Sequence, residues 1–170
     1  IRIKWYFFVM HTNQRNFVSV FLFLIIYFFS TDTIASPKYS SFSLDAISGE
    51  ILHNNRGFQT RYPASLTKVM TLYLIFEDLE DGKIQKSDLV AFSRNASSMP
   101  ASKLGLAPGE TITLSNAIKA LAIKSANDVA TAVAEHLSGT EESFATRMTN
   151  KARELGMYQT SFRNASGLHN

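Results

Sequence analysis

The sequence predicts a mixed domain, α+β or α/β, in which a β-hairpin precedes a series of helices. Residues 39–44 alternate apolar and polar side chains, the pattern of a half-buried strand, and a second strand begins at Ile51. Between them, residues 45–50 carry turn chemistry, with Gly49 suited to a positive φ. From Ser65 onward apolar residues recur with helical spacing. We expect the remaining strands of the sheet to lie outside this chain.

The first 36 residues are predicted to lie outside that domain. Residues 1–9 precede Met10 and are interpreted as a non-native upstream stretch. Residues 10–36 combine a basic start, a 13-residue apolar segment and small residues near Ala35, which are the three regions of a signal peptide. An uncleaved membrane anchor is the alternative, although a comfortable span needs about 20 residues. We therefore expect residues 37–170 to be exported and to form the folded domain.

The composition excludes several classes of function. The chain has a net charge of +3, but from Pro37 onward 14 Lys and Arg oppose 13 Asp and Glu, with no basic block. Nucleic acid is therefore not expected as a partner. Cysteine is absent, which removes disulfides, thiol nucleophiles and cysteine metal sites. We expect no metal and no cofactor, and we expect His53, His136 and His169 to be surface residues.

The helical part begins after Pro63, which disfavours helix at the residue before it. Apolar residues cover most of the circumference of the first helix, so it is predicted to be central and buried. Thr113 or Ser115 is a candidate cap of the second helix. The segment 87–99 is predicted to be loop-like. The predicted helices span residues 65–79, 117–123, 129–137 and 144–155, with interruptions at 81–82, 125–128 and 138–139.

A serine and a lysine at the start of the first helix carry candidate chemistry. Ser65 and Lys68 are three residues apart, so in a helix they share a face. A serine nucleophile needs a base within reach and donors for the oxyanion, and the first turn of a helix offers unpaired N–H groups. Burial among Leu66, Val69 and Met70 would lower the pKa of Lys68 and favour the neutral amine. The alternative is an ordinary helix start, with Ser65 as the cap and Lys68 in solvent.

The context of these residues resembles a known family. The segment Pro63 to Lys68, PASLTK, resembles the nucleophile motif of the penicillin-binding D-alanyl-D-alanine carboxypeptidases, which are low-molecular-weight serine peptidases related to β-lactamases. The second motif of that family, Ser-x-Asn, has a match at Ser125-Ala126-Asn127 between two helices. Another match, Ser93-Arg94-Asn95, is interpreted as chance. The resemblance runs from Ser41 to the end of the chain.

The resemblance implies a β-lactamase/transpeptidase-like catalytic domain, incomplete here, over residues 37–170. Ser65 would be the acyl-accepting nucleophile and Lys68 its base. Ser125 would relay a proton, and Asn127 would orient Lys68 and the substrate. The implied activity is removal of the terminal D-alanine from peptidoglycan stem peptides ending in D-Ala-D-Ala, with β-lactams as inhibitors. The implied location is the periplasm or the outer face of the cytoplasmic membrane, with membrane association of the full-length protein left open.

The sequence also departs from that family. It contains no Lys-Thr-Gly motif, which would bind the substrate carboxylate, so this chain alone is expected to be inactive. A β-lactamase is one alternative, but residues 129–170 lack the Glu-x-x-x-Asn segment of class A enzymes. A non-catalytic relative that binds cell-wall peptide or β-lactam is another alternative, and a gene remnant is a third.

Overall fold

The structure, a computed structural model, describes residues 39–169. These residues fall into two compact units, one ending at Gly57 and the other beginning at Phe58. The upstream stretch and signal peptide predicted over residues 1–36 lie outside the described residues. Among the helices that are described, none is long and apolar enough to cross a membrane.

The first unit is the predicted β-hairpin. Strand β1 (Ser41–Leu44) pairs with β2 (Ile51–Asn55) in antiparallel fashion, and Ser43 lies opposite His53. The turn is closed by Asp45, whose carboxylate accepts hydrogen bonds from the backbone N–H groups two and three residues later. These bonds hold the pKa of Asp45 below its usual value. The apolar residues of the first strand segment, Tyr39, Phe42 and Leu44, are exposed in the described structure, so this strand is not half-buried as predicted.

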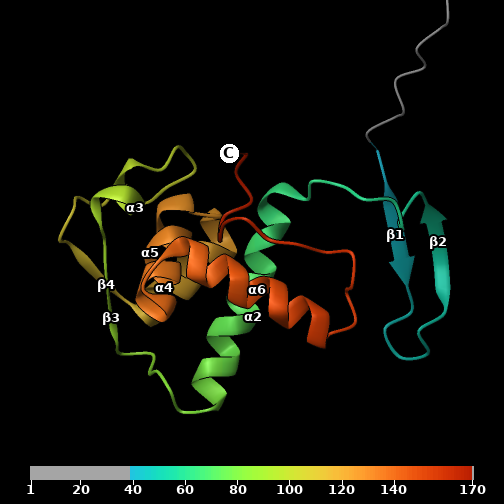
Figure 1. Ribbon diagram of the computed structural model, residues 1–170, viewed down its shortest axis with the longest axis horizontal. Coiled ribbons are helices and arrows are strands. Elements are labelled where there is room, and N and C mark those ends of the chain that lie inside the picture. Colours follow the sequence, from blue (N-terminus) through green and yellow to red (C-terminus); the bar gives the residue numbers. More distant parts are fainter. Residues whose placement is uncertain (1–38, 170) are drawn as a thin grey trace, which may run out of the picture. The chain divides into compact units, whose positions relative to one another are not determined.

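The second unit is a group of helices with one short strand pair at its edge, on the left in Figure 1. Helix α5 makes contacts with α2, α3, α4 and α6, and α6 also packs against α2. Antiparallel strand pairs combined with helices confirm the predicted α+β class. The elements of this unit are η1 (Ala64–Leu66), α2 (Thr67–Glu80), β3 (Leu89–Ala91), α3 (Arg94–Ser98), β4 (Thr111–Thr113), α4 (Leu114–Lys119), the π-helix η2 (Ala120–Lys124), α5 (Asn127–Ser138) and α6 (Glu141–Glu154).

The core of this unit is centred on α5, in which eight consecutive residues, 127–134, are buried. Each large apolar side chain removed from water contributes about 1.5–3 kcal/mol of transfer free energy, so the helices are held mainly by this cluster. Its largest fully buried apolar members are Leu74, Ile75, Val90, Phe92, Leu114, Val129, Val133, Phe144 and Met148.

Helix α2 is buried on one face only. Leu74 and Ile75 are fully buried, whereas Val69 is 62%, Tyr73 42% and Phe76 50% exposed among the described residues. The prediction of a helix buried all round is therefore wrong here, and the central helix is α5. When apolar residues occur all around a helix, the sequence alone does not show which face packs against the rest of the protein.

The structure corrects two predictions, the loop at residues 87–99 and the start of the last helix. The segment 87–99 is not a loop, because it holds β3 and α3. Ser93 starts α3 by accepting a hydrogen bond from the N–H of Ala96, the usual role of a serine N-cap. Helix α6 begins at Glu141, three residues before the apolar pattern suggests, since the hydroxyl of Thr140 caps it at the N–H of Ser143.

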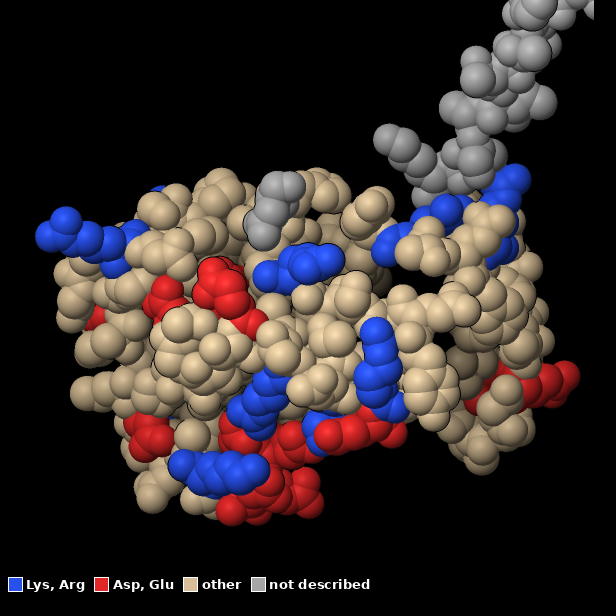
Figure 2. All heavy atoms as spheres, viewed as in Figure 1, with Lys and Arg blue, Asp and Glu red and all other residues tan. Residues whose placement is uncertain are grey.

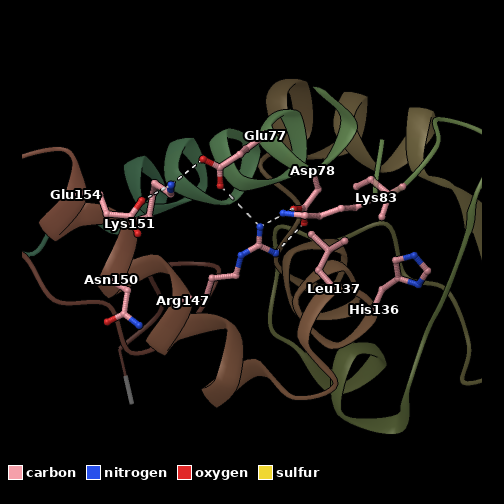
Figure 3. A pocket seen from close by; sticks show the side chains of 10 residues that line it. Glu77, Asp78, Lys83, His136, Leu137, Arg147, Asn150, Lys151 and Glu154 are labelled. Atoms are coloured by element: carbon pink, nitrogen blue, oxygen red, sulfur yellow. Dashed lines mark hydrogen bonds and ion pairs between the residues drawn. The ribbon is translucent and has the colours of Figure 1, made fainter. Parts of the chain in front are cut away.

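Ion pairs join α2 to α6 at the C-terminal end of α2 (Figure 3). The Arg147 guanidinium donates to both oxygens of Asp78, at 2.7 and 2.6 Å, and the Asp78 side chain is only 4% exposed. Lys151 pairs with Glu77 at 2.7 Å. The hydrogen bonds from Arg147 to Asp78 raise the pKa of Arg147. A buried carboxylate needs such a partner, so the pair fixes the position of α6 on α2.

Charged side chains of both signs lie on the face seen in Figure 2. Along the lower part of that face, Asp and Glu side chains gather next to Lys and Arg side chains. From Pro37 onward, 14 Lys and Arg oppose 13 Asp and Glu in the sequence.

Replacing Arg147 by methionine should destabilise the second unit by about 2–3 kcal/mol, because the buried carboxylate of Asp78 would lose both hydrogen bonds from the guanidinium. Lys83→Met is the matched control: Lys83 also lies near Asp78, at 3.7 Å, but its side chain is 61% exposed, and an exposed pair contributes less than about 1 kcal/mol. Urea unfolding of both variants measures the difference. Equal losses would contradict the assignment of Arg147 as the main partner.

Candidate active site

Ser65 lies in the 3₁₀ turn η1, directly before α2, and its side chain is exposed. The turn follows Pro63, and Ala64 has a positive φ of 50°. The helix proper begins at Thr67, two residues later than predicted, because Ser65 belongs to the tighter turn. The backbone N–H of Ser65 therefore stays in the first turn, where donors lack helical partners.

Lys68 is buried, with 3% exposure, in the first turn of α2. Its amine lies 2.8 Å from Oδ1 of Asn127, 2.8 Å from the Ser166 carbonyl oxygen and 3.4 Å from Oγ of Ser65. Burial lowers the pKa of Lys68 from its ordinary value. The residue is not a solvated helix lysine.

The source of this burial differs from the prediction. Leu66 and Val69, two of the three apolar neighbours expected to cover Lys68, are 70% and 62% exposed. The Lys68 amine instead forms hydrogen bonds with Asn127 of α5 and with Ser166 of the C-terminal segment. Sequence neighbours on a helix point to different sides, so the environment of Lys68 is set by elements distant in the chain.

The three contacts suit a neutral amine that acts as a base. A neutral amine has two N–H bonds and one lone pair. As a charged ammonium, Lys68 donates to all three oxygens, including Oγ of Ser65. Once the amine is neutral, the oxygens of Asn127 and Ser166, which can only accept, take its two N–H bonds, and its lone pair faces the Ser65 hydroxyl. The arrangement can therefore receive a proton from Ser65.

The Ser125-Ala126-Asn127 motif lies where η2 meets α5. Ser125 ends the π-helix in the left-handed region, with φ of 55°, and α5 begins at Asn127. Oγ of Ser125 is buried and has no hydrogen-bond partner within residues 39–169. A buried hydroxyl without a partner is costly, and such a group is a candidate for contact with a ligand. The described structure shows no hydrogen bond between the Ser125 hydroxyl and Lys68.

The amide of Asn127 is oriented from both ends. Nδ2 donates to the Pro100 carbonyl at 3.0 Å, so Oδ1 faces Lys68. The backbone N–H of Asn127 donates to the Ser102 carbonyl at 2.7 Å. The Ser102 hydroxyl also donates to the Lys124 carbonyl at 2.8 Å, on the other side of the motif. Residues 100–102 therefore hold the Ser125-Ala126-Asn127 motif in place through these hydrogen bonds. The sequence analysis did not predict this role.

Residues 164–167 form a second supporting turn that the sequence prediction missed. Asn164 closes it by accepting, at Oδ1, the N–H of Gly167 at 2.7 Å. Thr71 donates to the Ala165 carbonyl at 2.8 Å, and this places the Ser166 carbonyl at Lys68. The Asn-x-x-Gly pattern, which is typical of a turn closed by an asparagine side chain, is the signal that could have found it.

The other candidates of the sequence lie apart from these contacts. Ser93 caps α3, and Asn95 donates to Glu135, so the Ser93-Arg94-Asn95 match has a structural explanation. The histidines at 53, 136 and 169 are exposed. Over residues 39–169 no three His, Asp or Glu side chains are grouped to hold a metal ion.

Comparison with known proteins identifies the family. A family model described as D-alanyl-D-alanine carboxypeptidase matches residues 30–170. The chain belongs to the D-alanyl-D-alanine carboxypeptidase family. The predicted membership is therefore confirmed.

Individual relatives agree with this assignment. The chain is 43% identical over 138 residues to D-alanyl-D-alanine carboxypeptidase DacF of Bacillus subtilis, covering 81% of this chain and 36% of DacF. The crystal structure of penicillin-binding protein 5 from Haemophilus influenzae matches with a TM-score of 0.73 and 31% identity, over 77% of this chain and 39% of that one. Penicillin-binding protein D2 from Listeria monocytogenes, in an ampicillin-bound form, matches with a TM-score of 0.69 and 27% identity, over 77% of this chain and 52% of that one.

These matches confirm the predicted fold class. The two solved structures match over 77% of this chain, with TM-scores of 0.73 and 0.69. The chain spans about a third of the length of the DacF relative, 36%.

Gly167 should tolerate no side chain, because a Cβ there would lie 1.9 Å from the Ala64 carbonyl oxygen, next to Ser65. Gly167→Ala is expected to destabilise the unit by about 2–4 kcal/mol, which combines overpacking with positive φ. Gly156→Ala is the matched control, since Gly156 has the same φ of +82° but nothing within 4 Å of its Cβ position. It should lose only about 1 kcal/mol. Thermal unfolding of both variants gives the comparison, and equal losses would exclude the close approach as the cause.

Proposed function

We propose that the whole protein is a serine-type D-Ala-D-Ala carboxypeptidase that removes the terminal D-alanine of peptidoglycan stem peptides. The observation that carries this proposal is the buried Lys68 amine, held by Asn127 and Ser166 and facing Ser65. Membership of the carboxypeptidase family supports the same activity. A solvated lysine would stay protonated at neutral pH and could not act as the base.

In the proposed acylation step, Oγ of Ser65 attacks the carbonyl carbon of the D-Ala-D-Ala bond and its proton passes to Nζ of Lys68. The N–H of Ser65 is one donor to the oxyanion. The carbon–nitrogen bond then breaks, and a proton reaches the departing D-alanine amine through the Ser125 hydroxyl. Asn127 keeps Lys68 oriented and holds the substrate amide.

In the proposed second step, water attacks the acyl-enzyme ester, the bond to Ser65 breaks, and Oγ regains a proton. The products are the shortened stem peptide and a free Ser65. No metal or cofactor takes part in this proposal. The substrate carboxylate would be bound by the Lys-Thr-Gly motif of the family, which this chain lacks, so we propose that the chain alone is inactive.

We further propose that β-lactams acylate Ser65 because they mimic the D-Ala-D-Ala end. The ampicillin-bound form of the Listeria relative supports this. The proposed location is outside the cytoplasm, in the periplasm or on the outer face of the membrane, where the substrate lies. The signal peptide predicted over residues 10–36 supports export.

Intact mass spectrometry after exposure to penicillin tests the nucleophile. The protein made from its complete reading frame should gain the mass of one penicillin, and Ser65→Ala should gain none, because the substitution removes the hydroxyl that lies at the Lys68 amine. This chain alone is expected to remain unmodified. An adduct that persists in Ser65→Ala, or no adduct on the folded complete protein, would refute the assignment.

Assay of the same complete protein on a D-Ala-D-Ala peptide separates the proposed enzyme from its alternatives. Release of D-alanine supports the carboxypeptidase. A stable penicillin adduct without D-alanine release would favour a β-lactam-binding sensor, and rapid turnover of penicillin would favour a β-lactamase.

The rate of acylation by penicillin should rise with pH, since only the neutral Lys68 amine accepts a proton. Burial lowers the pKa of Lys68 from the ordinary 10.5, so the plateau should be reached below that pH. Lys68→Arg should lower the rate by about 10²-fold or more at every pH, because the guanidinium does not deprotonate. Stopped-flow acylation with a fluorescent penicillin measures both, and a rate independent of pH would rule out Lys68 as the titrating base.

A further inference from the structure

The backbone of Ala165 is held from both sides. Its N–H donates to Oε1 of Glu141 at 3.0 Å, and its carbonyl accepts from the Thr71 hydroxyl at 2.8 Å. The next carbonyl along the chain is that of Ser166, which accepts from the Lys68 amine at 2.8 Å. The peptide group bound by a side chain at the start of α6 is therefore two peptide groups before the one whose oxygen contacts Lys68.

Glu141 is itself fixed in place. It is the first residue of α6, where the helix dipole favours a carboxylate. The same oxygen, Oε1, also accepts from the Thr131 hydroxyl of α5 at 3.3 Å. Glu142, the next residue, is exposed. Of these two adjacent carboxylates, Glu141 is the one that reaches the turn at residues 164–167.

The direction of the Lys68 lone pair depends on two acceptors. With only the Asn127 contact at 2.8 Å, the amine could rotate about its terminal bond and turn its lone pair away from Ser65. The Ser166 carbonyl removes that freedom because it occupies the second N–H. A small displacement of this carbonyl should therefore reduce the fraction of molecules with Lys68 aligned for proton transfer.

We propose that Glu141 is a positioning residue for the acylation of Ser65. By binding the N–H of Ala165, it holds the Ser166 carbonyl where it orients the Lys68 amine. Glu141 makes its hydrogen bonds to Thr131 and Ala165 and acts on Lys68 through the backbone. The inference rests on the proposed function, since it concerns the same acylation step.

Two substitutions in the protein made from its complete reading frame test the proposal. Glu141→Leu removes the acceptor at similar size, and the second-order rate of acylation by fluorescent penicillin should fall by about 10–10²-fold, the usual effect of a misplaced catalytic group. Glu141→Gln keeps an oxygen acceptor and should stay within about 2-fold of the wild type, because a neutral amide still binds an N–H. Rescue by glutamine is the expected signature of an acceptor role.

Two controls separate positioning from a general loss of stability. Thr131→Val removes the other hydrogen bond to Oε1 of Glu141 but leaves the bond from Ala165. Glu142→Leu removes a carboxylate from the same helical turn. Both should acylate at the wild-type rate when assayed below their unfolding temperatures. Hydrogen exchange at the Ala165 amide should be faster in Glu141→Leu than in the wild type, Glu141→Gln or either control.

The outcomes are distinct. If Glu141→Leu acylates as fast as the wild type although Ala165 exchanges faster, Glu141 has no positioning role. If Glu141→Gln is as slow as Glu141→Leu, or Thr131→Val is equally slow, the acceptor explanation is wrong. If the folded wild type forms no adduct, the proposed function itself fails and this inference fails with it. A slow Glu141→Leu with all three other variants near wild type supports it.

Discussion

The buried amine of Lys68 is the constraint on which the rest of the site depends. At 3% exposure the amine has lost its hydrating water molecules, and a buried polar group without hydrogen bonds is costly. The chain must therefore place hydrogen-bond acceptors around it. It does so from α5, through Asn127, and from the segment after α6, through Ser166. The packing of α5 and α6 on α2 is therefore a condition for the chemistry. The ion pair between Asp78 and Arg147 secures that packing about 15 Å farther along α2, ten residues at 1.5 Å each.

Two irregular segments complete the site because helices alone cannot bring these groups together. The segment after Pro100 contacts both flanks of the Ser125-Ala126-Asn127 motif, and the turn at 164–167 contacts α2, α6 and η1. Each is held by hydrogen bonds between backbone groups and polar side chains, and Ala165 of the turn is also part of the apolar core. Such bonds have strict geometry, so they fix the position of a carbonyl more narrowly than apolar packing does. The helices provide a rigid frame, and these two segments orient the Asn127 amide and the Ser166 carbonyl toward Lys68.

The sequence predicted the parts of the fold and site that depend on local pattern. The hairpin, the helices and the pairing of Ser65 with Lys68 follow from periodicity, turn chemistry and the motif. The burial of Lys68 was predicted for the wrong reason, since Val69 is exposed and the real cover comes from residues 59 and 98 positions away. Contacts at that separation leave no periodic trace in one sequence. For the same reason, the supporting role of residues 164–167 was missed.

Backbone strain shows how the site is kept in place. Among the described residues of the second unit, the non-glycine residues with positive φ are Ala64 and Ser125, at 50° and 55°. Ala64 precedes the proposed nucleophile, and Ser125 is the proposed proton relay. Each such residue costs about 1–3 kcal/mol and persists only where its surroundings over-determine it. Here the close approach of Gly167 to Ala64 and the hydrogen bonds of Ser102 around the Ser125 motif provide those surroundings. The strained residues and their supports are therefore parts of one arrangement, and relaxing the turn at Ala64 would move the Ser65 hydroxyl away from Lys68.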